Sequence, residues 1–216
     1  MIDSFDYPTM LSMLREKKPF AFVRYGDGEL NCMMGCVGAN TKCEHKYSPE
    51  LAKALKHAMV AEKDYHIGMM VNVLAGNEYS SKLARELAEK LPICSSLILH
   101  HASGRGKLAA FFKAVGPVVM VGPRHMSGMA PWLNITRHVE IPDRNCWEKT
   151  EKIIPQLTSG ETYLFVASMP AKVWIREAWD KKTTLIDIGS VFDPYVGIKS
   201  RSYMRAGKYT LAESLV

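Results

Sequence analysis

Residues 20–30 read FAFVRYGDGEL, and this stretch carries the strongest indication of both the fold and the chemistry. Its first four residues form a continuous apolar run, which is typical of a strand covered on both faces of a sheet. The run leads into Gly26 and Gly28, which lie on either side of Asp27. Glycines let the backbone turn sharply and let a ligand approach it closely. We therefore expect a buried strand that ends in a ligand-binding turn.

Three charged side chains in this stretch suit a metal ion and a phosphate. Asp27 and Glu29 are two residues apart, so on a non-helical backbone they can point the same way and share one hard divalent cation. Arg24 adds a fixed positive charge that suits a phosphate group. A cation, a diphosphate and a strand end together indicate nucleotide-sugar chemistry. The structural alternative is an ordinary Gly-Asp-Gly turn with Glu29 at a helix N-terminus, where acids are favourable.

Apolar runs of strand length recur along the chain, at 20–23, 66–71, 96–99, 118–121, 138–141, 163–166 and 184–188. Helical patterns lie between them. Ser48-Pro49-Glu50 is a helix start signal, leucines recur at 83, 87 and 91, and Asn145 with Glu148 resembles a capping box. Strands that alternate with helices predict an α/β fold: one Rossmann-like domain over residues 1–216, with a mostly parallel sheet flanked by helices.

Ligands of such sheets bind at the carboxyl ends of the strands, beside a switch in strand order. Five segments are expected there: 24–29, 100–101, 122–125, 168–172 and 187–193. Lys172 suits a phosphate, although an exposed lysine on an ordinary strand–helix connection fits equally well. Asp187 would end a buried strand and so needs a partner, either a neighbouring charge or a sugar hydroxyl. Asp193 precedes Pro194, so it is either a catalytic base or a turn former, and we favour the turn former.

Two segments carry a resemblance to a known family. Arg24–Glu29 resembles the Asp-x-Glu signature of the GT-D type of glycosyltransferases. Residues 163–172 (YLFVASMPAK) and 185–190 (LIDIGS) resemble the late strand, turn and helix of that family, followed by its Asp-Ile-Gly strand end. The resemblance spans residues 20–193 and is sharp at these two places. One departure is the turn at 168–171, which contains no glycine where the family pattern has one.

The resemblance implies a metal-dependent enzyme that moves a sugar from a nucleotide-sugar, expected to be a UDP-sugar, to a hydroxyl acceptor. Asp27 and Glu29 would bind Mn²⁺ or Mg²⁺ and act in catalysis, and Arg24 would contact the diphosphate. The donor site would also include Tyr25, Gly26, Gly28, Ser168, Lys172, Asp187, Gly189 and Ser190. We expect inversion by an acceptor alkoxide; the base is unassigned, with Asp193 as a candidate.

Composition narrows the setting of the chain. Its 216 residues, 47% of them hydrophobic, suffice for one domain with a substantial core. The sequence contains no apolar run long enough to cross a bilayer and no signal-peptide pattern near its first residues. Five cysteines, an odd number, give no secreted disulfide pattern. We therefore expect a cytoplasmic protein, or one of the host-cell cytoplasm if the chain is viral.

The net charge of +6 makes a polyanionic partner worth weighing. Basic residues crowd the segment 194–216, namely Lys199, Arg201, Arg205 and Lys208. The acceptor could therefore be DNA that carries hydroxymethylated pyrimidines, or else a glycan or a protein. Two other functions stay open: a metal-dependent phosphate-ester hydrolase, and a non-catalytic nucleic-acid-binding module that uses the basic segment. The donor sugar and the oligomeric state are left open.

Three other motifs in the sequence do not indicate a function. The Rossmann fingerprint fails because Asn31 stands where its third glycine should be, and residues 100–108 lack the spacing of a Walker A loop. His100 and His101 are expected to be structural or surface residues, with at most one facing a cleft. The residues Cys32, Cys36, Cys43 and His45 lack the spacing of a structural zinc site, and buried free thiols explain the first two better.

Overall fold

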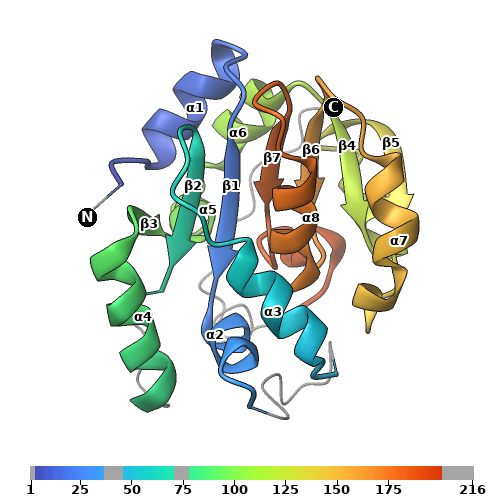
Figure 1. Cartoon of the computed structure of the whole chain (residues 1–216). Coiled ribbons are helices and arrows are strands. Elements are labelled where there is room, and N and C mark those ends of the chain that lie inside the picture. Colours follow the sequence, from blue (N-terminus) through green and yellow to red (C-terminus); the bar gives the residue numbers. More distant parts are fainter. Residues whose placement is uncertain (1–2, 37–45, 71–77, 201–216) are drawn as a thin grey trace.

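In the computed structural model, which describes residues 3–36, 46–70 and 78–200, the chain forms a three-layer α/β domain (Figure 1). Seven strands of the described residues form one sheet in the order β3-β2-β1-β7-β6-β4-β5, and every neighbouring pair is parallel. The strands are β1 (Ala21–Tyr25), β2 (Tyr65–Met69), β3 (Ile93–Ser95), β4 (Pro117–Gly122), β5 (Asn134–Glu140), β6 (Thr162–Phe165) and β7 (Thr184–Asp187). The expected parallel α/β fold is confirmed.

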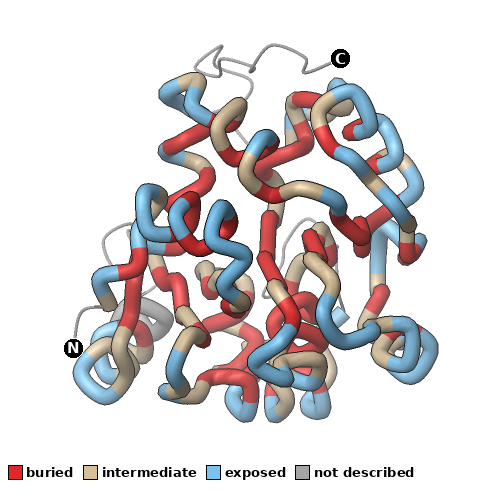
Figure 2. Tube along the Cα trace, turned by 90° about the horizontal axis from the view of Figure 1, so that it is seen from above, coloured by how far each residue is buried: buried red, intermediate tan, exposed pale blue. Residues whose placement is uncertain are grey.

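Helices cover both faces of the sheet. One face packs against α2 (Asp27–Met33), α3 (Pro49–His57), α4 (Glu78–Lys90), α7 (Thr150–Ile153) and α8 (Pro170–Ala178). The other packs against α1 (Tyr7–Arg15), α5 (Ile98–Gly104), α6 (Leu108–Val115) and two 3₁₀ helices, η1 (Arg124–Met129) and η4 (Asp193–Val196). Two further 3₁₀ turns, η2 (Cys146–Lys149) and η3 (Ile154–Gln156), flank α7. Figure 2 shows the buried residues concentrated between these outer layers.

Strand β1 shows why the apolar runs are continuous. Ala21, Val23 and Tyr25 belong to the core on the α2/α3/α8 side, while Phe20 and Phe22 belong to the core on the α1/α5/α6 side. Successive side chains of a strand point to opposite faces, so a strand covered on both faces needs apolar residues at every position. The helix start at Ser48 is also confirmed, because its hydroxyl accepts the N–H of Leu51 at 3.2 Å.

Three local expectations were wrong. The expected strand at 96–99 is a turn followed by the start of α5, and the strand itself, β3, lies just before it. A short apolar run packs equally well as a strand or as a helix face, so its pattern alone does not distinguish the two. The expected capping box at Asn145 is absent: Asn145 has φ of 53°, and its side-chain oxygen accepts the backbone N–H of Lys46 at 2.9 Å.

The third error concerns the motif itself. The backbone after Gly26 is helical rather than extended, because α2 begins at Asp27. Glu29 accounts for this: its carboxylate reaches back one turn and accepts the N–H of Gly26 at 2.9 Å, as the acidic residue of a capping box does. The structural alternative for Glu29, an acid in the first turn of a helix, therefore describes the local structure correctly.

Candidate functional site

The strand order places a topological switch point between β1 and β7. These two strands are neighbours, but the chain leaves β1 into α2 on one face and leaves β7 toward η4 on the other. The connections therefore diverge at the carboxyl ends of the two strands, the position where open parallel sheets bind ligands. In Figure 1 this edge lies at the bottom of the sheet, where the arrowheads of the strands point.

Lys172, on the first turn of α8, is the centre of this edge. Its ammonium lies 2.8 Å from an oxygen of Glu29, 2.9 Å from an oxygen of Asp187 and 2.9 Å from the carbonyl oxygen of Ser168. An ammonium has three N–H donors, so three acceptors from three segments saturate it. The side chain is only 4% exposed. The interpretation of Lys172 as an exposed lysine is therefore wrong, because its buried ammonium holds three segments together as a clamp.

The two carboxylates fix the charge of the clamp. Burial alone would lower the pKa of the Lys172 ammonium, but Asp187 and Glu29 more than compensate, so this pKa lies above its ordinary value. Burial would raise the pKa of Glu29, whereas the ammonium of Lys172 and the N–H of Gly26 lower it, with a net shift downward. Both groups are thus held in their charged forms near neutral pH.

Arg24 forms a second clamp beside the first. Its guanidinium donates to the carbonyl of Ser96 at 2.6 Å and to that of Ile188 at 2.9 Å, and it lies 3.0 Å from Nδ1 of His100. These partners come from the turn after β3, the end of β7 and helix α5. All three nitrogens of the Arg24 side chain therefore contact protein acceptors, and Arg24 holds three strand ends together.

Asp187 joins the two clamps. One carboxylate oxygen accepts the backbone N–H of Arg24 at 3.2 Å and faces Lys172, while the other accepts the N–H of Gly189 at 3.0 Å. Asp187 is fully buried, so its expected need for a partner is confirmed. Gly189 has φ of +57°, and a Cβ atom there would lie 2.0 Å from a guanidinium nitrogen of Arg24. An alanine at this position would therefore strain the backbone and displace the guanidinium of Arg24.

His100 is a site residue for which the sequence favoured a structural or surface role. Because a guanidinium can only donate, Nδ1 of His100 must accept from Arg24, and a neutral ring then carries its proton on Nε2. That nitrogen lies 3.4 Å from the hydroxyl of Ser190. The sequence placed His100 at the end of an expected strand at 96–99. The side chain belongs instead to helix α5, so its contact with Arg24 was not predicted. His101 beside it is exposed, which agrees with the expectation that at most one of the two histidines faces the cleft.

The remaining expected site residues lie in different environments. Asp27 is exposed, and the space around Gly28 is open, with no atom within 4 Å of an added Cβ. Tyr25 points away from this edge: it is fully buried, and its hydroxyl donates to the carbonyl of Leu55 at 3.1 Å. Burial raises the pKa of Tyr25 far above its ordinary value. A direct contact between the Tyr25 side chain and a ligand would need a rearrangement of the core.

Two loop residues show how their turns are built. Ser168 has φ of +50°, the left-handed conformation that glycine adopts most easily, so the backbone keeps the conformation that the glycine of the family pattern would supply. Asp193 begins η4, is buried, and accepts a hydrogen bond from the hydroxyl of Ser200. The favoured interpretation of Asp193 as a turn former agrees with this geometry.

The arrangement of carboxylates fits a divalent cation only in part. Asp27 and Glu29 occupy helical positions i and i+2, which do not face each other. Both oxygens of Glu29 already accept protein donors, so Asp27 is the carboxylate of the motif that is open to an ion. Among the described residues no group of three or more His, Cys, Asp or Glu side chains is arranged to hold a metal. Cys32, Cys36, Cys94 and Cys146 are free thiols, and Cys43 and His45 lie outside the described residues.

Comparisons with known proteins agree on the fold. No family model matches the sequence, and no curated protein matches it significantly. Among solved structures, the chain is similar to a protein described as a new glycosyltransferase (DUF1792) from Streptococcus sanguinis. The TM-score is 0.69 at 17% identity, over 96% of this chain and 86% of that one. The protein described in the words "the highly conserved domain of unknown function 1792 has a distinct glycosyltransferase fold" gives 0.69 at 14% identity, over 99% and 92%.

A third similar structure, a selenomethionine-substituted DUF1792 domain, gives a TM-score of 0.66 at 14% identity. These likenesses at low identity establish a shared fold that covers nearly the whole chain. The structure also bears on a membrane role: in the described ranges, no helix has the length and apolar character that crossing a bilayer requires.

Proposed function

We propose that this protein is a glycosyltransferase that moves a sugar from a nucleotide-sugar, most simply a UDP-sugar, to a hydroxyl acceptor. One observation carries the proposal. The segments that resemble the GT-D motifs, Arg24–Glu29, Ser168–Lys172 and Asp187–Ser190, meet at a switch point of a fold shared with a protein described as a glycosyltransferase. Switch points of parallel sheets are where nucleotides commonly bind.

Within this proposal the residues have separate tasks. Asp27, exposed at the strand end, would hold Mn²⁺ or Mg²⁺ against the donor diphosphate. Such an ion would stabilise the charge on the departing nucleotide. The open surface at Gly28 lets the diphosphate approach the backbone. Arg24 and Lys172 would support the donor site through protein contacts, because they hold the ends of β1, β6 and β7 in place for the donor.

The transfer forms a bond between the acceptor oxygen and the anomeric carbon and breaks the bond from that carbon to the diphosphate oxygen. The proton of the acceptor hydroxyl passes to a base. Asp193 stays a candidate for this base by its position after β7, although its carboxylate already accepts from Ser200. Inversion at the anomeric carbon is the simplest outcome of a single displacement.

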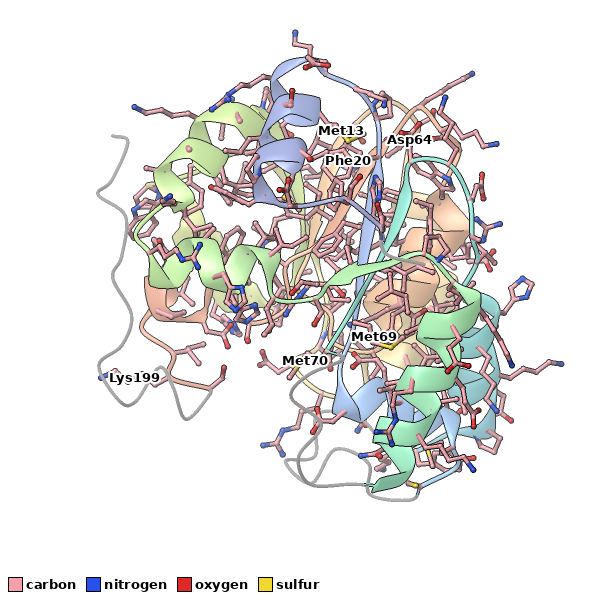
Figure 3. All side chains as sticks on the ribbon, turned by 90° about the vertical axis from the view of Figure 1, so that its left-hand side faces the viewer. Met13, Phe20, Asp64, Met69, Met70 and Lys199 are labelled. Carbon is pink, nitrogen blue, oxygen red and sulfur yellow. The ribbon has the colours of Figure 1, made fainter. Side chains whose placement is uncertain are left out.

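For the acceptor, a hydroxyl on DNA, a glycan or a protein is proposed. The carboxyl edge carries exposed cations, which favours an anionic acceptor such as DNA with hydroxymethylated pyrimidines. Arg124 follows β4, Arg144 follows β5, and Lys199 lies at the same edge as Met69 and Met70, opposite Phe20 and Asp64 (Figure 3). Arg201, Arg205 and Lys208 lie outside the described residues. A steep fall of activity with salt would favour DNA, and indifference to salt would argue against it.

Two rival functions make different predictions. A phosphate-ester hydrolase would consume a nucleotide without an acceptor, but such enzymes commonly need more clustered acids than Asp27 and Glu29 supply here. A nucleic-acid-binding module would bind DNA without a metal and would ignore nucleotide-sugars.

A thermal-shift screen tests the proposal. UDP, UDP-sugars and other nucleotides are added with and without Mn²⁺ to the wild type and to Asp27→Asn, because a ligand that binds only the folded state raises its melting temperature. We expect a shift with a UDP-sugar and Mn²⁺ that the variant loses. Absence of a shift with every nucleotide would contradict the proposal. Release of the nucleotide without sugar transfer to any acceptor in a DNA, glycan and peptide panel would point to the hydrolase.

A further inference from the structure

We propose that Glu29 is a positioning residue that anchors Lys172, and that cation binding at this edge depends on Asp27 and not on Glu29. The first half stands on the structure alone, and the second rests on the proposed function. In a shared metal site, both acids of the Asp-x-Glu motif would bind the ion, whereas here each acid has its own role.

The direction of the two side chains is the first argument. Asp27 and Glu29 are the first and third residues of α2, and residues two apart on a helix point to different sides. Their environments differ accordingly: Asp27 is exposed, whereas the side chain of Glu29 is 12% exposed. One ion at ordinary ligand distances of about 2.0–2.6 Å would need both carboxylates on one side.

The partners of Glu29 are the second argument. One oxygen lies 2.8 Å from the ammonium of Lys172, and the other accepts the N–H of Gly26 at 2.9 Å. A divalent cation on the first oxygen would lie within a few ångströms of that ammonium in a buried site, where like charges repel strongly. A cation on the second would displace the hydrogen bond that begins α2. Glu29 therefore fits the protein's own donors and not an added cation.

The role of Lys172 is the third argument. The ammonium connects Glu29 after β1 with Ser168 after β6 and Asp187 at the end of β7. Glu29 and Asp187 therefore both hold it by a carboxylate, although only Glu29 belongs to the motif and Asp187 also accepts the N–H groups of Arg24 and Gly189. Asp187 supplies a control outside the motif, because Asp187→Asn removes the same kind of partner from Lys172 as Glu29→Gln.

The experiment measures Mn²⁺ binding and stability separately. Glu29→Gln, Asp187→Asn and Asp27→Asn are titrated with Mn²⁺, with and without UDP, and free Mn²⁺ is read by its electron paramagnetic resonance signal. The same proteins are unfolded in urea. The titrations are done in trimethylamine oxide, which favours the folded form of weakened variants. No sugar transfer is needed for either measurement.

We expect Glu29→Gln to resemble Asp187→Asn: both unfold at lower urea, and both keep the Kd for Mn²⁺ within about threefold of the wild type. Asp27→Asn should keep the urea midpoint and weaken Mn²⁺ binding by about tenfold or more. An equal loss of Mn²⁺ affinity in Glu29→Gln and Asp27→Asn would overturn the inference, and so would a wild type that binds no Mn²⁺ even with UDP. A protein that binds Mn²⁺ and UDP through Asp27 but transfers no sugar would overturn only the proposed function.

Discussion

The carboxyl edge and the amino edge of the sheet each carry a cation between acceptors, but the two surroundings differ. At the carboxyl edge, Lys172 is buried between Glu29 and Asp187. At the amino end of β6, Arg137 lies 2.9 Å from Glu161 and 3.1 Å from the hydroxyl of Tyr163, and the Arg137 and Glu161 side chains are each 38% exposed. The contact distances are alike, so distance does not distinguish the two.

Burial does distinguish them. At the amino edge, water can replace a lost partner of Arg137 or Glu161. At the carboxyl edge, a carboxylate of the Lys172 clamp that lost its partner would stay buried without solvation. An exposed ion pair contributes little to stability, while breaking a buried one is costly. The comparison indicates that the buried clamp holds the ends of β1, β6 and β7 together without a ligand, as a site that must orient a donor requires.

The largest effect is expected for Lys172→Met. The substitution removes the ammonium and leaves Glu29 and Asp187 facing each other in a buried space, which should cost about 3–5 kcal/mol of unfolding free energy. Arg137→Met, the matched change at the amino edge, should cost under about 1 kcal/mol. Urea unfolding of both variants measures the difference. Equal losses would show that burial does not separate the two edges.

Gly189→Ala should follow. The Cβ would collide with the guanidinium of Arg24 in a backbone with φ of +57°, so we expect a loss of more than about 2 kcal/mol. Gly160→Ala is the control, since Gly160 has φ of +83° with open space around it and should show only the cost of the left-handed backbone, about 1 kcal/mol. Thermal unfolding compares the two. A Gly189 variant no weaker than the Gly160 variant would mean that Arg24 is free to move.

The pH dependence of stability should separate the edges further. The pKa of Glu29 is lowered by folding, so its contribution is present above the unfolded value of about 4.3 and is lost as the pH falls through the folded value. The pKa of Lys172 is raised by folding, so its contribution is present below about 10.4 and is lost as the pH rises through the folded value. The clamp is therefore complete from about pH 5 to pH 10.

We expect Glu29→Gln to be less stable than the wild type by about 2 kcal/mol at pH 7, with the difference shrinking below about pH 4.3. Urea unfolding across this range measures it. Glu161→Gln at the exposed edge is the control and should show a smaller difference at pH 7. A gap for Glu29→Gln that stays constant down to pH 2 would show that its charge is not what stabilises the clamp.

The smallest effect is expected for Ser168→Gly. Glycine adopts the positive φ of this turn without strain, and this gain exceeds the entropy that glycine loses on folding. The free energy of unfolding should therefore rise by about 0.5 kcal/mol, and the melting temperature with it. Thermal unfolding measures it. A lower melting temperature would mean that the side chain of Ser168 stabilises the turn more than its conformation strains it.

The sequence predicted the sheet because the apolar runs at β1, β4, β6 and β7 are continuous, have the length of strands and alternate with helical patterns. It failed at residues 96–99, where an apolar run forms the start of α5 and brings His100 to Arg24. The sequence correctly predicted that the segments of Glu29, Lys172 and Asp187 lie at one edge, because each follows the carboxyl end of a predicted parallel strand. It could not predict their mutual contacts, since strand order and helix register are set by tertiary packing.

The most direct test of the central claim, that the carboxyl edge between β1 and β7 binds the donor, is hydrogen–deuterium exchange with and without a UDP-sugar and Mn²⁺. Exchange slows where a bound ligand suppresses local opening. We expect protection in peptides that cover 24–33, 166–172 and 187–193, and no change around Arg137 and Glu161. Protection confined to the amino edge, or to no part of the chain at saturating ligand, would contradict it.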